Sequence, residues 1–182
     1  MNQQTFETPR QPRSVFALAE MSTGMSVLTW SMCVLGLALP IVIFIAAPEV
    51  WMSMLLAGVI WGTYAFVWVF YRPSRFEICR SGLRIVWPMR SFYIPAAEIA
   101  EIAPISKSAL GLVLRTFGAG GLWGGFGRFW SRKMGHMLIY ASRSDGLVCI
   151  RRGRERTVLI SPARPDEFIT ELQRVCSAGG ES

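Results

Sequence analysis

Two long runs of uncharged residues stand near the N-terminus, separated by only two residues. Residues 25–47 form the first run of 23 residues, and residues 50–71 form the second run of 22. A helix rises about 1.5 Å per residue, so either run is long enough to cross a hydrocarbon core about 30 Å thick. The sequence therefore predicts two transmembrane helices joined by a tight turn at Pro48 and Glu49.

The charges around these runs predict their orientation. A cleaved signal peptide is a poor alternative for the first run, which is too long, begins late and is followed at once by another span. The connecting turn holds only Glu49, whereas arginines flank the runs on their other side, so the positive-inside rule places both termini in the cytoplasm. The flanking arginines are Arg10, Arg13, Arg72, Arg75, Arg80 and Arg84.

Small residues mark one face of the second predicted helix. Gly58 and Gly62 are four residues apart, a spacing that lets helix backbones approach closely. Two interpretations follow, packing against the first helix or formation of a homodimer. Neither run contains an ionisable Asp, Glu, Lys, Arg or His, which argues against a transport pathway.

The rest of the chain predicts a basic cytoplasmic domain. We divide the sequence into an N-terminal cytoplasmic segment (residues 1–24), the hairpin (25–71) and a domain (72–182). The domain carries 17 Lys and Arg against 9 Asp and Glu, a formal charge of +8. Because such a domain lies beside a bilayer, we expect membrane lipids or an acidic protein as its partner, ahead of nucleic acid.

The domain sequence alternates short β-prone runs with turn residues. Its last part differs, because Pro165 and two acids precede apolar residues at helical spacing, which predicts an amphipathic helix. A sheet of this size buries a core only if it curls and the helix covers its open side. The prediction is an α+β membrane protein with a curled antiparallel barrel of about seven strands capped by a C-terminal helix. The predicted strands are residues 75–78, 82–86, 91–95, 98–105, 136–141, 146–151 and 156–161.

A segment rich in glycine and aromatic residues occupies positions 118–130. It lacks the spacing of a phosphate-binding loop. Its large rings and neighbouring cations favour contact with the membrane or a protein partner. The alternative is that the rings pack inside the barrel or against the hairpin while the glycines make turns. The predicted contact residues are Trp123, Phe126, Arg128, Phe129, Trp130, Arg132 and Lys133.

A second basic segment forms a predicted strand connection at residues 151–156. Arginine matches phosphate geometry, so a phosphate contact is one interpretation and a solvated turn is the other. The residues concerned are Arg151, Arg152, Arg154 and Arg156.

Residues for catalysis or metal binding are sparse. His136 is the only histidine, and the four cysteines show no C-x-x-C pair. The acids of the predicted domain form no convergent pair that would act as acid and base. We therefore predict no enzymatic activity, no cofactor and no metal site.

Four pieces of the domain form a distinctive set: R-F-x-I-x-x-x-G-L-R-I at 75–85, I-P-x-x-E-I at 94–99, the Gly/aromatic stretch at 117–129 and I-S-P-x-x-P-x-x-F at 160–168. Together with the hairpin, they resemble the bacterial PH-like (pleckstrin homology-like) membrane proteins. The resemblance extends from about residue 25 to residue 176. It implies a PH-like fold, residence in the bacterial inner membrane and no established chemistry.

These observations lead to two hypotheses on function. The first is a non-enzymatic, membrane-anchored interaction module whose PH-like domain docks a protein partner or the anionic inner leaflet. The second is an accessory or assembly subunit of a larger membrane complex, which binds through the transmembrane hairpin.

Overall fold

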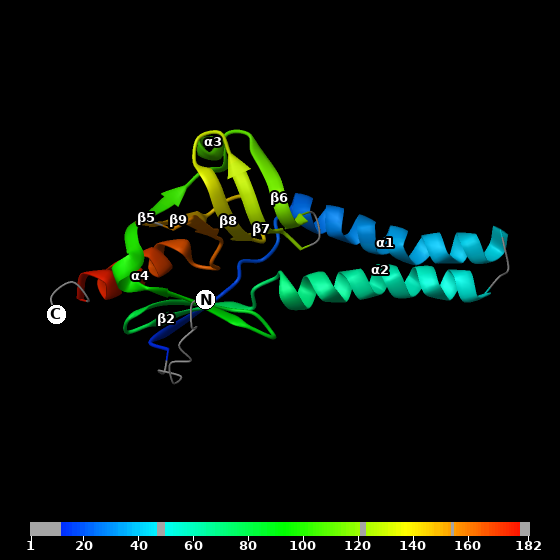
Figure 1. Ribbon diagram of the computed structural model, residues 1–182, viewed down its shortest axis with the longest axis horizontal. Helices are drawn as coiled ribbons and strands as arrows, with labels where there is room; N and C mark the ends of the chain where they lie inside the picture. The colour runs from blue at the N-terminus through cyan, green and yellow to red at the C-terminus, as the bar shows by residue number, and fades with distance from the viewer. Residues whose placement is uncertain (1–11, 47–49, 121–122, 154, 179–182) are drawn as a thin grey trace.

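Two long helices project from one end of a domain made of two sheets and a helix (Figure 1). The computed structural model describes residues 12–46, 50–120, 123–153 and 155–178. Helix α1 spans Thr23–Ala46 and helix α2 spans Val50–Phe70, close to the two predicted runs. The predicted turn at Pro48 and Glu49 lies outside the described residues.

The two helices pack side by side through Gly36 of α1. A Cβ atom at this position would lie 3.0 Å from Cγ2 of Ile60 and 3.1 Å from the hydroxyl oxygen of Tyr64, so glycine permits the close approach. The Tyr64 hydroxyl donates a hydrogen bond to the carbonyl oxygen of Met32 at 2.7 Å. Both helices are long and apolar enough to cross a membrane. Only 17% and 6% of their most apolar 18-residue stretches are buried, unlike core helices of soluble proteins.

The first sheet is antiparallel and contains a strand that precedes the hairpin. Its order is β1 (Ser14–Ala17), β2 (Arg75–Cys79), β3 (Gly82–Val86) and β4 (Ser91–Pro95). Strand β1 pairs with β2 in a register that places Phe16 opposite Phe76. Sequence analysis did not assign this strand, because four residues show too little alternation to reveal it.

The second sheet has six strands in the order β5-β9-β10-β8-β7-β6. Its strands are β5 (Ile99–Ile105), β6 (Val113–Gly120), β7 (Gly125–Ser131), β8 (Gly135–Ala141), β9 (Leu147–Arg152) and β10 (Thr157–Ile160). A 3-10 helix, Ala96–Glu98, precedes β5, and the short helix α3, Lys107–Leu110, connects β5 to β6.

This arrangement differs from the predicted barrel in two respects. The described domain has two open sheets, whereas we expected one curled sheet of about seven strands. In addition, β10 pairs with β8 in parallel, although it pairs with β9 in antiparallel fashion. Strand β10 lies between its two predecessors, and the order of strands along the chain does not reveal which strands are neighbours in space.

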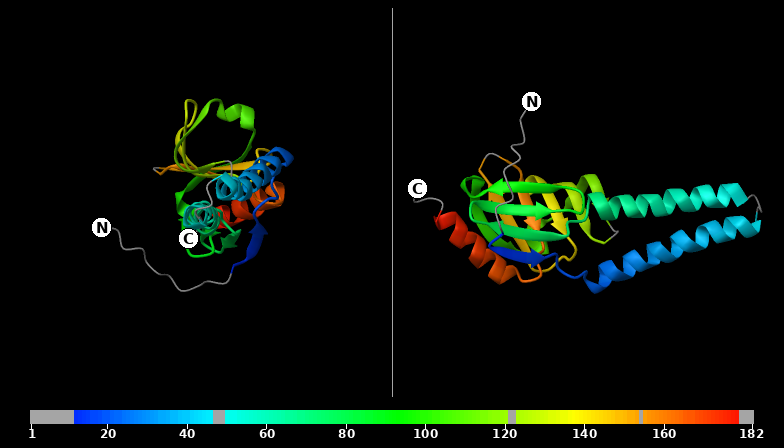
Figure 2. Two further views of the ribbon diagram at one scale, coloured as in Figure 1. Left: turned by 90° about the vertical axis from the view of Figure 1, so that its right-hand side faces the viewer. Right: turned by 90° about the horizontal axis from the view of Figure 1, so that it is seen from below.

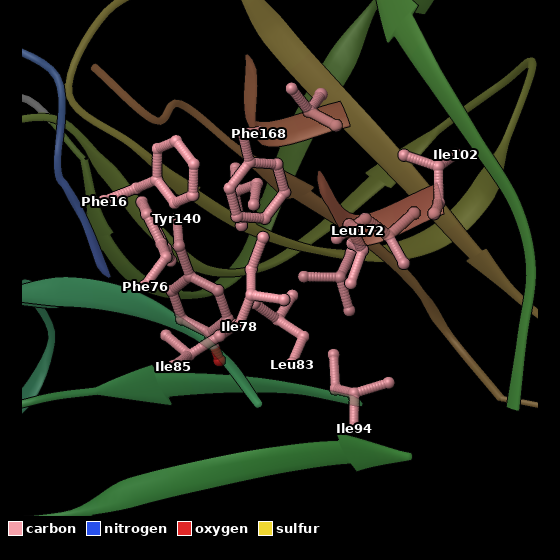
Figure 3. Packing of buried hydrophobic residues seen from close by; sticks show 14 of the residues in the cluster. Phe16, Phe76, Ile78, Leu83, Ile85, Ile94, Ile102, Tyr140, Phe168 and Leu172 are labelled. Carbon is pink, nitrogen blue, oxygen red and sulfur yellow. The ribbon is translucent and has the colours of Figure 1, made fainter. Parts of the chain in front are cut away.

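Helix α4, Pro165–Ala178, confirms the predicted C-terminal helix and completes the core between the sheets. Its Phe168, Leu172 and Val175 are buried at helical spacing. Figure 3 shows Phe168 and Leu172 directed toward side chains of the first sheet, including Ile78 and Leu83. A smaller cluster joins Leu110 of α3 to buried side chains of the second sheet, so apolar side chains pack on both of its faces.

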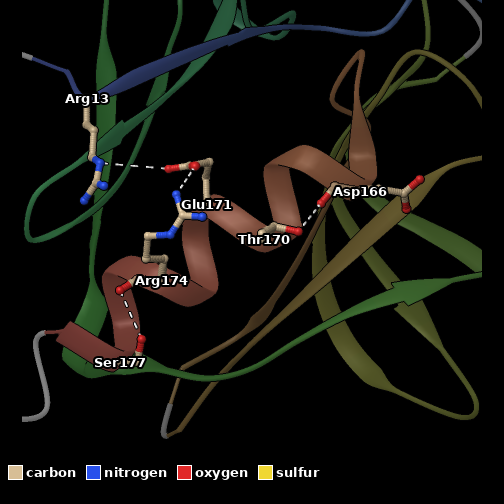
Figure 4. A network of polar contacts seen from close by, with 6 residues as sticks. All are labelled: Arg13, Asp166, Thr170, Glu171, Arg174 and Ser177. Atoms are coloured by element: carbon tan, nitrogen blue, oxygen red, sulfur yellow. Dashed lines mark hydrogen bonds and ion pairs between the residues drawn. The ribbon is translucent and has the colours of Figure 1, made fainter.

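The segment before the hairpin is joined to both parts of the domain. The ring of Phe16 packs edge-on against Phe168, with centroids 5.2 Å apart. The backbone N–H of Ala19 donates to the carbonyl of Ser161 at 2.9 Å, just after β10. Arg13 forms an ion pair with Glu171 of α4 at 3.9 Å (Figure 4). Both chain segments that flank the hairpin are therefore part of the same folded domain.

Candidate functional site

The Gly/aromatic segment forms the β6–β7 hairpin. Gly118 and Gly127 face each other across the two strands and have φ angles of 133° and 123°. A Cβ atom at Gly118 would lie 2.2 Å from the carbonyl oxygen of Phe126, and one at Gly127 would lie 2.4 Å from that of Phe117. These glycines therefore allow two backbones to approach closely.

Trp123, beside the turn of this hairpin, contacts both long helices. Its backbone N–H donates to Oγ1 of Thr29 in α1 at 3.1 Å. Its ring lies edge-on to two rings of α2, with centroids 5.0 Å from Trp68 and 6.2 Å from Tyr64. The end of the second sheet is thus attached to the base of the helix pair, as the arrangement in Figure 1 shows.

The other predicted aromatic contacts lie in different environments. Phe126 is fully buried in the main core, so its ring is not available to a membrane or a partner. Phe129 is partly buried against the smaller cluster, and Trp130 is partly exposed. The rings therefore do not form one continuous surface.

The structure also exposes apolar side chains that sequence analysis did not select. Leu114 and Phe117 of β6 are 51% and 64% exposed on an edge strand. The sequence did not predict that these two side chains lie on the same face of the sheet, because the pairing of β6 with β7 shifts between Arg115 and Phe117. Such a bulge changes the simple alternation of inward and outward residues.

The predicted cations divide into paired and unpaired groups. Arg128, Arg132 and Lys133 are exposed and form no ion pair within the described part of the chain. In contrast, Arg151 pairs with Glu101 at 3.1 Å. Carboxylates thus neutralise part of the second basic segment, residues 151–156, but they do not neutralise the three cations of residues 128–133.

The rest of the second basic segment is equally mixed. Arg152 pairs with Glu98 and, at 4.0 Å, with Glu155. Arg156 is exposed, and Arg154 lies outside the described residues. Two of the four arginines proposed for phosphate contact are therefore already engaged with acids.

The small-residue face of α2 is open. A Cβ atom added at Gly58 or Gly62 would meet no atom of the described residues within 4 Å, whereas Gly36 of α1 is crowded by α2. The close packing of the hairpin therefore uses Gly36, and the Gly58 and Gly62 face points away from it. Sequence analysis missed Gly36 because neither residue four positions away, Met32 or Pro40, is small.

Side chains of the domain also bind the end of α2. The indole Nε1 of Trp87 donates to the carbonyl oxygen of Tyr71 at 3.0 Å. A guanidinium nitrogen of Arg90 donates to the carbonyl oxygen of Phe70 at 2.9 Å. Both contacts satisfy carbonyl groups that a helix C-terminus leaves without partners, and a cation is favourable there.

Titratable groups that would suit a metal do not converge. Among the residues with described positions, no group of three or more His, Cys, Asp or Glu side chains comes together. His136 is exposed, and Glu98 and Glu101 are bound to arginines of β9. The clearest feature of this region is the set of contacts between the domain and the adjoining ends of α1 and α2.

Comparison with known protein families gives one match. The family model described as "Bacterial PH domain" matches residues 74–176, which begin just after the helix pair and end within α4. No curated protein and no solved structure matches the chain.

Proposed function

The chain belongs to the bacterial PH domain family, and we propose that it is a non-enzymatic interaction module anchored in a membrane by its helical hairpin. PH-like domains are in general interaction modules for proteins or lipids. In this proposal the domain docks the anionic inner leaflet or a protein partner at the membrane surface.

The membrane anchor is supported by the two apolar helices and their placement. They leave the domain from the same end and expose most of their apolar surface (Figure 2). Strand β1 precedes the hairpin and pairs with β2 after it, which supports a position of both hairpin ends on one side of the membrane. The flanking arginines support the cytoplasm as that side, and we propose the bacterial inner membrane as the location.

The contact of Trp123 with the helices is the observation that carries the proposal. Trp123 packs against Tyr64 and Trp68, seven and three residues before the end of the predicted span at Tyr71. At about 1.5 Å per residue, the ring lies between about 5 and 10 Å below the point where the chain leaves the bilayer. Interfacial side chains reach this same depth, which supports a position of Trp123 in the headgroup region.

This placement favours docking of the leaflet through the Gly/aromatic segment. Arg128 lies in β7, whereas Arg132 and Lys133 follow the opposite end of that strand, where Lys133 lies beside Gly111 at the end of α3. None of the three has a neutralising partner in the described structure. Each cation near an anionic leaflet contributes about 1 kcal/mol. The exposed ring of Phe117 adds apolar surface beside Arg128, its cross-strand neighbour.

A second candidate function uses the hairpin. The open face at Gly58 and Gly62 favours an accessory or assembly subunit that binds a helix of a larger complex, or a homodimer. In that case the partner contacts α2 and not the domain.

Photo-crosslinking of the full chain in native membranes separates these candidates. Benzoylphenylalanine is placed singly at Phe117, Trp130 and Phe66, with Arg80 at the distal β2–β3 turn as the control. We expect lipid adducts from Phe117 and Trp130 above the level at Arg80. A discrete protein adduct at these two positions would identify a protein partner of the domain. A discrete protein adduct from Phe66 alone would support the hairpin function, and no adduct above the control at any position would refute both.

A further inference from the structure

Arg72 and Arg90 lie at the end of α2 and are not part of the docking segment, whose Arg128 lies on β7. We infer that Arg72, Arg90 and Arg128 form a binding site for the phosphate of an anionic phospholipid headgroup at the junction between α2 and the domain. The inference rests on the proposed membrane anchoring. It adds a ligand class and a site that is separate from the arginines of β9 and from the exposed Arg132 and Lys133.

Arg72 and Arg90 are both held at the end of α2. The guanidinium carbon of Arg72 lies 4.2 Å from the centroid of the Trp68 ring, which fixes the side chain along the helix. Arg90 reaches the same helix end through its hydrogen bond to Phe70. Its guanidinium carbon also lies 4.8 Å from the centroid of the Trp87 ring.

Tyr140 links Arg90 to Arg128. The rings of Tyr140 and Trp87 pack edge-on, with centroids 5.1 Å apart. Burial raises the pKa of the Tyr140 hydroxyl, and the positive charges of Arg90 and Arg128 both act against that rise. The strand register also brings Arg128 near Tyr140, because its cross-strand partner Leu138 lies two residues from Tyr140 on the same face of β8. The Tyr140 hydroxyl is itself a hydrogen-bond donor.

No acid neutralises the arginines at this junction. Some arginines of the domain do pair with acids, as Arg75 and Arg84 do with Glu77 at 2.7 and 3.7 Å. None of the three junction arginines forms an ion pair with a carboxylate among the residues that the structure describes. Positive charge is thus concentrated without a protein counter-charge.

Arg72 provides an independent indication of a missing acceptor. Its Nε atom is buried and has no hydrogen-bond partner in the described structure. Burial lowers the pKa of its guanidinium group. A buried donor on a charged group is costly to leave unpaired, and phosphate oxygens match guanidinium geometry.

The position of the site favours a lipid over a soluble anion. Arg72 follows α2 by two residues, and Arg90 contacts the last residue of that helix. If α2 spans the membrane, both side chains lie at the level of the phosphates of the cytoplasmic leaflet. A headgroup is then present at high local concentration, whereas a soluble phosphate must compete with it.

The test measures lipid retention by the full chain. The protein is reconstituted into nanodiscs of phosphatidylcholine with phosphatidylglycerol, transferred to detergent and analysed by native mass spectrometry. We expect R72Q, R90Q and R128Q each to lower the ratio of phosphatidylglycerol-bound to lipid-free protein about fivefold, which corresponds to about 1 kcal/mol per cation. The matched control R80Q removes one unpaired exposed arginine at the distal turn and should change the ratio less than twofold.

Three results would overturn the site. The first is unchanged phosphatidylglycerol retention in the triple variant, and the second is an equal loss in R80Q. The third is displacement of the bound lipid by millimolar inorganic phosphate, which would identify a soluble anion as the ligand. If R72Q lowers the unfolding midpoint, the exposed R90Q and R128Q decide the matter. Lipid adducts from Phe117 together with unchanged retention would refute this site while leaving the proposed function intact.

Discussion

Phe16 is the residue that most directly connects the N-terminal segment to the domain core. It is buried and packs against Phe168, although it precedes α1 in the chain. We expect Phe16→Ala to lower the free energy of unfolding by about 3–5 kcal/mol, because it leaves a cavity between β1 and α4. Equilibrium unfolding of the detergent-solubilised chain measures this change.

Val15 provides the matched control for Phe16. It is the neighbouring residue of β1 and is 48% exposed, so Val15→Ala should change the free energy of unfolding by less than about 0.5 kcal/mol. Equal effects of the two substitutions would show that β1 does not contribute its inward face to the core.

Cys79 and Cys149 should make stability depend on alkaline pH. Burial raises the pKa of both thiols in the folded chain. Below the ordinary thiol pKa of about 8.5, both states are protonated and the thiols contribute no pH dependence. Above it the unfolded chain loses protons first, so stability falls as pH rises toward the raised pKa values. We expect the thermal midpoint to fall between pH 8 and pH 10.

The double variant Cys79→Ala, Cys149→Ala tests the source of that fall. Its midpoint should change less over the same pH interval, even if its midpoint at pH 8 is lower. Tyr140, whose pKa burial also raises, accounts for part of the remaining dependence. An identical pH slope in the double variant and the parent chain would contradict the assignment to the thiols.

Among the elements, the β6–β7 hairpin depends on backbone approach. Gly127→Ala would force a Cβ atom against the carbonyl of Phe117 at a positive φ angle. We expect it to lower the free energy of unfolding by about 1–3 kcal/mol or more. The fluorescence of Trp123 should change with it, because this residue connects the hairpin to α1 and α2.

Gly125→Ala is the control within the same hairpin. A Cβ atom at Gly125 would make only ordinary contacts, at 3.7 Å to Phe129 and 4.0 Å to Ile139. Its effect on unfolding should therefore be small. A larger loss from Gly125→Ala than from Gly127→Ala would argue against the observed pairing of β6 with β7.

At the scale of the whole molecule, the hairpin interrupts a domain that begins before it. A soluble protein made of residues 72–182 alone lacks β1 and exposes the core beneath Phe16. Joining residues 12–20 to residue 72 through a glycine-serine linker restores that strand. We expect the joined protein to have the higher thermal midpoint and the smaller tendency to bind a hydrophobic dye.

Introducing Phe16→Ala into the joined protein completes this comparison. The substitution should remove most of the gain over residues 72–182 alone, since the gain comes from burying β1 against Phe76 and Phe168. A joined protein that is no more stable than residues 72–182 would show that β1 associates with the domain only when the hairpin is present.

The sequence by itself determined most of the helices and strands, because local patterns of apolar and polar residues predict them. The uncharged runs predicted α1 and α2, and helical spacing of Phe168, Leu172 and Val175 predicted α4. The seven predicted strands correspond to β2–β5 and β8–β10. The physical reason is that periodicity records which side chains of one element are buried together, and this needs no knowledge of distant residues.

Tertiary structure alone decided the contacts between distant segments. The four residues of β1 become a strand only by pairing with β2, 58 or more residues later. Gly36, and not Gly58 or Gly62, is the glycine packed between the helices, because only a neighbouring helix distinguishes one small residue from another. Likewise, Arg72 and Arg75 look alike in sequence, yet only Arg75 meets a carboxylate. Which strands, glycines and charges meet depends on long-range packing, which local periodicity does not encode.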